Sequence, residues 1–119
     1  MKFFLKFLFL LCLLLACAPT KQNELTVKLE ITNPKVGKVP IVLMLEYQSK
    51  PLTKAAVTVR GDMTHAGMSP VEAQAREIGE GRYALDNFGF TMSGDWVLSI
   101  TAKKGTQILT GEAKLGVNP

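Results

Sequence analysis

The only histidine of the chain, His65, lies between Met63 and Met68 in a segment rich in groups that can bind a metal ion. This segment runs from Gly61 to Pro70, and its glycines and closing proline indicate a turn at the end of a strand. Imidazole nitrogen and thioether sulfur are ligands that suit copper, above all Cu(I). The residue types and their spacing therefore predict a candidate copper site at a turn.

The spacing within the segment favours a shared ligand point. Ala66 and Gly67 are small, so the backbone between His65 and Met68 can turn until both side chains face one position. Met63 lies two residues before the histidine, and on an extended chain such residues lie on the same side. A fourth candidate ligand, Met92, lies in another glycine-containing strand end farther along the chain.

A packing role competes with metal binding for two of the methionines. Met63 continues the alternation of Val57 and Val59, so it could equally extend the buried face of a strand. Met92 could likewise be structural. His65 is a weak signal alone, because a lone histidine is more often a surface residue than a ligand. Its two close thioethers strengthen the metal hypothesis.

Catalysis around the histidine is not predicted. Asp62, Thr64 and Ser69 lie close to His65 in sequence, but neighbouring side chains on an extended chain point to opposite faces and do not form a triad. No nucleophile elbow, phosphate-binding loop or His-Glu zinc motif occurs in the chain. We therefore expect a protein that is not an enzyme.

The N-terminus has the pattern of a lipoprotein signal. Residues 1–6 form a short segment made basic by Lys2 and Lys6. Residues 7–15 are apolar, and Ala16 precedes Cys17. This pattern predicts a signal peptide over residues 1–16, a lipidated tether over 17–23 that begins at Cys17, and one domain over 24–119. The protein would be exported and lipid-anchored at the periplasmic or extracellular face of a cell membrane. An ordinary secretory signal and an uncleaved anchor are the alternatives.

Cysteine count and charge narrow the function classes. Cys12 lies in the predicted signal, and Cys17 would carry the lipid, so the mature domain would have no free thiol. That excludes a disulfide framework, a thiolate zinc site and a cysteine nucleophile. Without Lys2 and Lys6, 12 of the 14 basic residues remain against 10 acidic ones, a net charge of +2. The basic residues are scattered, so we expect no nucleic-acid partner.

The rest of the chain alternates apolar and polar residues in short runs separated by turn formers. The runs predict strands over 25–32, 39–47, 55–62, 71–78, 82–86, 96–102 and 107–115, with a long turn over 87–94. Pro40 is expected at a strand start or an edge, and Trp96 in the core. The pattern is typical of an all-β, antiparallel, immunoglobulin-like β-sandwich of about seven strands.

The order of these features resembles the YtkA-like family of small exported β-sandwich domains. The matching stretches cover roughly residues 25–102 and comprise Asn33-Pro-Lys-Val-Gly37, Lys50-Pro-Leu-Thr-Lys-Ala55, the Met/His turn, Gly81-Arg-Tyr83 and Phe90-Thr-Met92-Ser-Gly94-Asp-Trp96. The architecture is also similar to that of FixH-type proteins and CopC-like copper carriers. The resemblance implies an immunoglobulin-like sandwich outside a membrane, in a family often linked to copper handling, oxidase assembly or metal efflux.

The resemblance also bears on the ligands. Met63, His65 and Met68 fall in the turn where relatives often place methionine and histidine, and Met92 falls in the Met-x-Gly-x-Trp element. The chain lacks the N-terminal histidine of a CopC-like Cu(II) site, which favours Cu(I).

Two functions follow as hypotheses. The first is a membrane-anchored domain that binds or transfers copper, with an oxidase or efflux complex in the membrane as a partner. The alternative is a metal-free interaction or scaffold module that docks to a membrane protein complex. A third, weaker hypothesis is a small-ligand pocket beneath a loop that carries Phe88 and Phe90. The oligomeric state is left open.

Overall fold

The structure is a computed structural model that describes residues 23–64 and 69–119. It is built from eight strands: β1 (Thr26–Glu30), β2 (Gly37–Tyr47), β3 (Lys50–Pro51), β4 (Ala56–Met63), β5 (Val71–Gly79), β6 (Arg82–Phe90), β7 (Gly94–Lys104) and β8 (Gln107–Val117). The predicted all-β antiparallel fold is confirmed. The strand beyond the predicted seven is β3, which lies in a stretch expected to be a loop. In the described part of the chain, no helix is long and apolar enough to cross a membrane.

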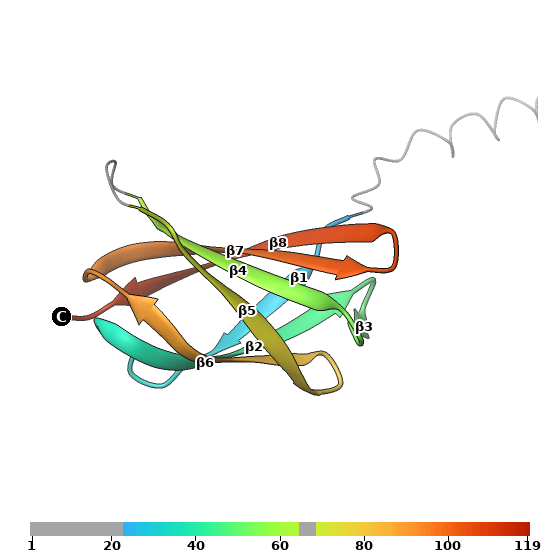
Figure 1. The fold of residues 1–119 in the computed structure, drawn as a ribbon, viewed down its shortest axis with the longest axis horizontal. Coiled ribbons are helices and arrows are strands. Elements are labelled where there is room, and N and C mark those ends of the chain that lie inside the picture. The colour runs from blue at the N-terminus through green and yellow to red at the C-terminus, as the bar shows by residue number, and fades with distance from the viewer. Residues whose placement is uncertain (1–22, 65–68) are drawn as a thin grey trace, which may run out of the picture.

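The strands pair in the order β1-β2-β6-β5-β4-β7-β8, and β3 pairs with β2. Each of these pairings is antiparallel. β5 links the two layers, because residues 71–75 pair with β4 and residues 76–79 pair with β6. The sheet therefore folds over along β5, and the two layers enclose the core (Figure 1).

Aromatic side chains form the centre of the core. Trp96, Phe88 and Phe90 are each at most 1% exposed. The ring centroid of Phe90 lies 5.2 Å from that of Trp96 and 5.1 Å from that of Phe88, and both pairs have edge-to-face geometry. The prediction of Trp96 as a core residue is confirmed.

Tyr83 ties the loop after β3 to this core. Its hydroxyl donates to the Leu52 carbonyl oxygen at 2.9 Å and accepts from the Ala55 backbone N–H at 3.3 Å. Burial raises the pKa of the Tyr83 hydroxyl above its ordinary value. The hydroxyl therefore stays a neutral donor that fixes the start of β4.

The predicted turn over 87–94 is wrong in its first half, because β6 continues to Phe90. Pro40 of β2 faces two residues of β6, Asp86 and Asn87, in a β-bulge. Before the bulge the odd-numbered residues of β6, Tyr83 and Leu85, face inward, and after it the even-numbered Phe88 and Phe90 do. The strand therefore does not show the strict alternation by which strands are predicted from sequence. The bulge also explains why Pro40 lies inside β2 rather than at its start, since a ladder hydrogen bond is interrupted there.

Isolated parallel bridges connect the two edges of the sheet at both ends of the molecule. Glu24, just before β1, bridges to Thr110 of β8, and Lys35, just before β2, bridges to Asn118, just after β8. Backbone hydrogen bonds of 2.8–2.9 Å make these contacts: Leu25 N to Thr110 O, Thr110 N to Asn23 O, Val36 N to Asn118 O, and Asn118 N to Pro34 O. The sheet is therefore joined to itself at two points, one beside the N-terminal segment and one beside the C-terminus.

Candidate metal centre

Met63 lies at the end of β4, where it is paired with Trp96 of β7. Its side chain is partly buried and packs against the core. The methyl carbon of Met63 lies 2.8 Å from the position that a Cβ on Gly94 would take. Gly94 has a φ of +129°, a conformation that favours glycine, so the missing side chain makes room for the methionine. The packing role predicted for Met63 is therefore present in the structure.

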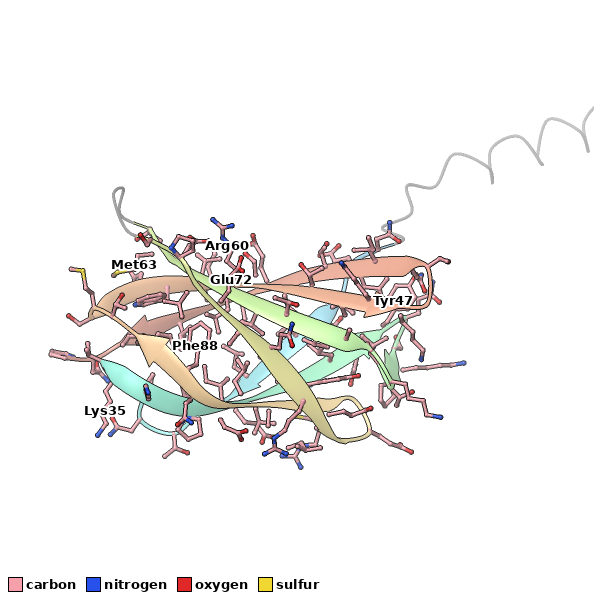
Figure 2. All side chains as sticks on the ribbon, viewed as in Figure 1. Lys35, Tyr47, Arg60, Met63, Glu72 and Phe88 are labelled. Carbon is pink, nitrogen blue, oxygen red and sulfur yellow. The ribbon has the colours of Figure 1, made fainter. Side chains whose placement is uncertain are left out.

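Met92 lies in the turn between β6 and β7 and is 52% exposed. Its carbonyl oxygen accepts a hydrogen bond of 2.9 Å from the Trp96 indole N–H. The backbone of Met92 is thus bound to the residue that pairs with Met63. The pairing of β4 with β7 brings the two methionine-bearing strand ends to the same end of the sandwich, where Figure 2 labels Met63.

His65 and Met68 lie outside the described residues, and so does Cys17. The chain enters the 65–68 segment from Thr64, whose backbone N–H donates to the Asp95 carbonyl oxygen at 3.3 Å. The ligand roles of His65 and Met68 therefore stay predictions. What the structure places is Met63, Met92 and the point from which the segment leaves the sandwich.

Charged side chains surround this end of β4. Arg60 lies 3.2 Å from the carboxylate of Asp62 and 3.9 Å from that of Glu72. Both acids therefore have a cationic neighbour, which lowers the negative charge that they present near Met63. Among residues 23–64 and 69–119, no group of three or more His, Cys, Asp and Glu side chains is arranged to hold a metal ion.

Sequence reasoning missed a surface hollow beside this end. It opens next to Thr64 and is lined by Thr64, Asp95, Trp96, Val97, Lys114, Leu115 and Gly116. Asp95 and Lys114 are the charged residues of its lining. No local motif marks Lys114, because the register between β7 and β8 alone brings it there.

The small-ligand pocket beneath a Phe88–Phe90 loop was a wrong expectation. Both residues lie in β6 rather than in a loop, and their rings are buried in the core. The two aromatic side chains fill space between the layers rather than covering a pocket from a loop.

Comparison with known proteins gives one match. A family model described as YtkA-like matches residues 20–101. No curated protein and no solved structure matches the chain. The matched region extends from the N-terminal segment into β7 and includes Met63, the 65–68 segment and Met92.

Proposed function

The chain belongs to the YtkA-like family, and from this premise we propose that it is an exported, lipid-anchored domain that binds Cu(I) and passes it to a partner. The ligands would be His65 and Met68, with Met63 and Met92 from the adjoining strand ends. The lipid would be carried by Cys17. The protein would act by binding and transfer, without catalysing a reaction.

The observation that carries the proposal is the contact between Met63 and Gly94. It joins the end of β4, from which the 65–68 segment leaves, to the β6–β7 turn that holds Met92. Met63 and Met92 thus lie on adjoining strand ends at one end of the domain, and His65 and Met68 follow Met63 in the sequence by two and five residues. This arrangement supports a shared site, because the two strand ends meet in space although they are far apart in the sequence.

The chemistry of these groups suits transfer. A thioether is neutral and soft, so it binds Cu(I) without losing a proton. It also needs no thiolate, which fits a domain that would work in an oxidising compartment. Met92 is half-exposed, so a partner's ligand could reach a metal held beside it and displace one sulfur at a time. The partner would belong to a membrane protein complex such as an oxidase or an efflux system.

The test is a Cu(I) titration against a competing chelator. We expect the double variant His65→Ala/Met68→Leu to bind at least about tenfold more weakly than the wild type, which corresponds to ~1.4 kcal/mol. The histidine change removes the imidazole, and the leucine keeps a similar apolar volume without the sulfur. Equal affinity of the two proteins would contradict the proposal.

Single methionine variants test the recruited ligands. We expect Met92→Leu to weaken Cu(I) binding, and Met44→Leu to leave it unchanged. Met44 is a matched control because it is a partly buried methionine in the middle of β2, paired with Lys28 and Arg82 rather than placed at the candidate site. A loss of affinity in both variants would point to a general effect on the fold.

One observation favours the metal-free interaction module as a second candidate. Val36 is 40% exposed and Met92 is 52% exposed. Gly37 pairs with Phe90, which places both side chains at the same end of the sandwich. If the end serves docking alone, Val36→Asp should abolish capture of a membrane complex, and the wild type should not compete with the chelator for Cu(I).

A further inference from the structure

Asn23, the first residue that the structure describes, and Met63 lie at opposite ends of the sandwich. β7 begins at Gly94, beside Met63, and ends at Lys104, at the β7–β8 turn. Eleven residues of extended strand at about 3.3 Å per residue separate these ends by about 30–35 Å. Figure 2 labels Met63 at one end and Tyr47, which accepts a hydrogen bond from Gln107, at the other.

The chain enters the domain at the end that holds the β7–β8 turn. Asn23 accepts a hydrogen bond from Thr110, and Thr110 accepts one from Leu25. Thr110 lies only three residues after Gln107, the first residue of β8. In Figure 1 the blue start of the described chain accordingly lies close to the turn between β7 and β8.

The length of the tether limits how far this end can lie from a membrane. This step depends on the lipid anchor at Cys17 in the proposed function. Six residue steps separate Cys17 from Asn23, and at 3.3–3.6 Å per residue they span at most about 20–22 Å. That is shorter than the domain, so the Asn23 end stays close to the bilayer surface.

The β7–β8 hairpin end, residues 103–108, has the side chains that suit an anionic lipid surface. Lys103 and Lys104 are exposed, and Ile108 is 53% exposed beside them. Lys50 adds a third exposed amine. It lies near the hairpin end because it pairs with Tyr47, whose hydroxyl accepts a hydrogen bond from Gln107.

The acidic residues of this end are placed differently. Glu77 and Glu80 lie on the β5–β6 hairpin, which Figure 1 shows on the far side of this end from the blue start of the described chain. Glu77 there accepts hydrogen bonds from the Lys54 backbone N–H. Glu24, bridged to Thr110, and Glu46, paired with Thr26 and Pro51, lie nearer, but neither is on the turn itself. The turn beside the tether is therefore the basic part of this end.

We propose that the β7–β8 hairpin end contacts anionic lipid headgroups and holds the sandwich upright on the membrane. Ammonium groups within a Debye length of about 8–10 Å are attracted to such a surface, and lysines at the far end are screened from it. The exposed Ile108 inserts its apolar side chain among the headgroups. The end with Met63 and Met92 then faces away from the bilayer, about 30 Å from its surface.

This orientation specifies the kind of partner that can take the metal. A site buried in the bilayer lies too far from Met92 for direct ligand exchange. The partner must be a water-soluble carrier, or a domain of a membrane complex that protrudes as far as the sandwich does.

The experiment uses the full lipidated chain in vesicles of phosphatidylcholine with phosphatidylglycerol. One cysteine is introduced for a fluorescent donor, either Thr106→Cys at the hairpin or Thr91→Cys at the other end, and headgroup-labelled lipids act as acceptors. Both positions are exposed. We expect severalfold stronger energy transfer from position 106 than from position 91. Equal transfer from both positions would overturn the proposal.

Charge reversal tests the role of the lysines. Lys103→Glu/Lys104→Glu should bring the two transfer signals closer together, as should vesicles of phosphatidylcholine alone. Lys35→Glu/Lys38→Glu is the matched control at the far end, where Figure 2 labels Lys35, and should change nothing. No response to the hairpin change, or an equal response to the control, would also overturn the proposal.

Two further readouts separate this inference from the copper proposal. Flotation with vesicles tests the lipid anchor, and a chain that fails to float overturns the orientation. Cu(I) affinity, measured on the same proteins in detergent, should not respond to the hairpin change. A chain that binds no copper but shows the expected transfer pattern contradicts the proposed function and leaves the orientation intact.

Discussion

At the scale of single residues, Gly94 decides where Met63 lies. The glycine has a positive φ and leaves a space that the methionine methyl group occupies. Alternation in the sequence predicts Met63 as the next inward position of a strand. In the structure its side chain is partly buried against the core. Packing and metal binding are compatible for a methionine at a strand end, because its sulfur can remain reachable while its methyl group is covered.

We expect Gly94→Ala to lower the free energy of unfolding by about 1–2 kcal/mol. The new Cβ would lie 2.8 Å from the Met63 methyl carbon, and alanine strains the positive φ. Chemical denaturation measures the change. Gly116→Ala is the control, because Gly116 pairs with Asp95 at the same end and an added Cβ there meets no atom within 4 Å. Equal destabilisation by both changes would contradict the role of the Gly94 space.

At the scale of elements, the bulge between β2 and β6 is the main departure from a regular pattern. It extends β6 through Phe90 and turns Phe88 inward, against Gly61 of β4 in the facing layer. The ring of Phe88 lies 2.8 Å from the position of a Cβ on Gly61, so the two layers approach closely here. The stretch 87–90 is thus part of the core that positions the Met92 turn.

We expect Phe88→Ala to cost about 3–5 kcal/mol of stability, as for a buried aromatic side chain whose removal leaves a cavity. Asn87→Ala, at the exposed neighbouring position, should change stability by no more than about 0.5 kcal/mol. Thermal or chemical unfolding distinguishes them. A small effect at Phe88 would mean that this stretch behaves as the turn that alternation alone predicts.

The pairing of β5 with β6 includes an exposed ion pair. Arg76 donates two hydrogen bonds, of 3.0 and 2.9 Å, to the carboxylate of Asp86. The hydrogen bond from Arg76 holds the pKa of Asp86 below its ordinary value. A carboxyl group with a lowered pKa in the folded state adds stability above its ordinary pKa and loses it as the pH falls through the folded value.

We therefore expect the denaturation midpoint of the wild type to fall as the pH is lowered below the ordinary range for aspartate. Asp86→Asn should have a weaker dependence in that window, because the amide does not titrate. The measurement is urea unfolding across a pH series. Identical slopes for wild type and variant would show that the ion pair is not linked to stability, as for many exposed pairs.

At the scale of the whole molecule, the two ends of the sandwich have different surroundings. One carries the start of the described chain and the β7–β8 turn with Lys103 and Lys104; the other carries Met63, Met92, Lys35, Lys38 and the C-terminus (Figure 1). Backbone hydrogen bonds that join the residues just before β1 and just before β2 to Thr110 and Asn118 close the sheet at both ends. The loop before β2 is thus bound to Asn118, near the C-terminus, through Pro34 and Val36.

We expect a chain that ends at Val117 to expose the Val36 amide, since that amide donates to the Asn118 carbonyl oxygen. Hydrogen exchange at Val36 should accelerate by about tenfold or more. A chain that ends at Asn118 retains the acceptor and is the control. Unchanged exchange in the shorter chain would show that the contact at this end is not maintained in solution.

The sequence by itself determined seven of the eight strands in outline, the antiparallel all-β class and the buried Trp96, because alternation and turn residues are local properties. The tertiary structure decided which strands pair. It placed β4 beside β7, and so brought Met63 to Gly94 and to the turn of Met92. It also decided the bulge and the short β3 strand. Pairing between strands distant in sequence depends on contacts across the whole sheet, and no local repeat encodes them.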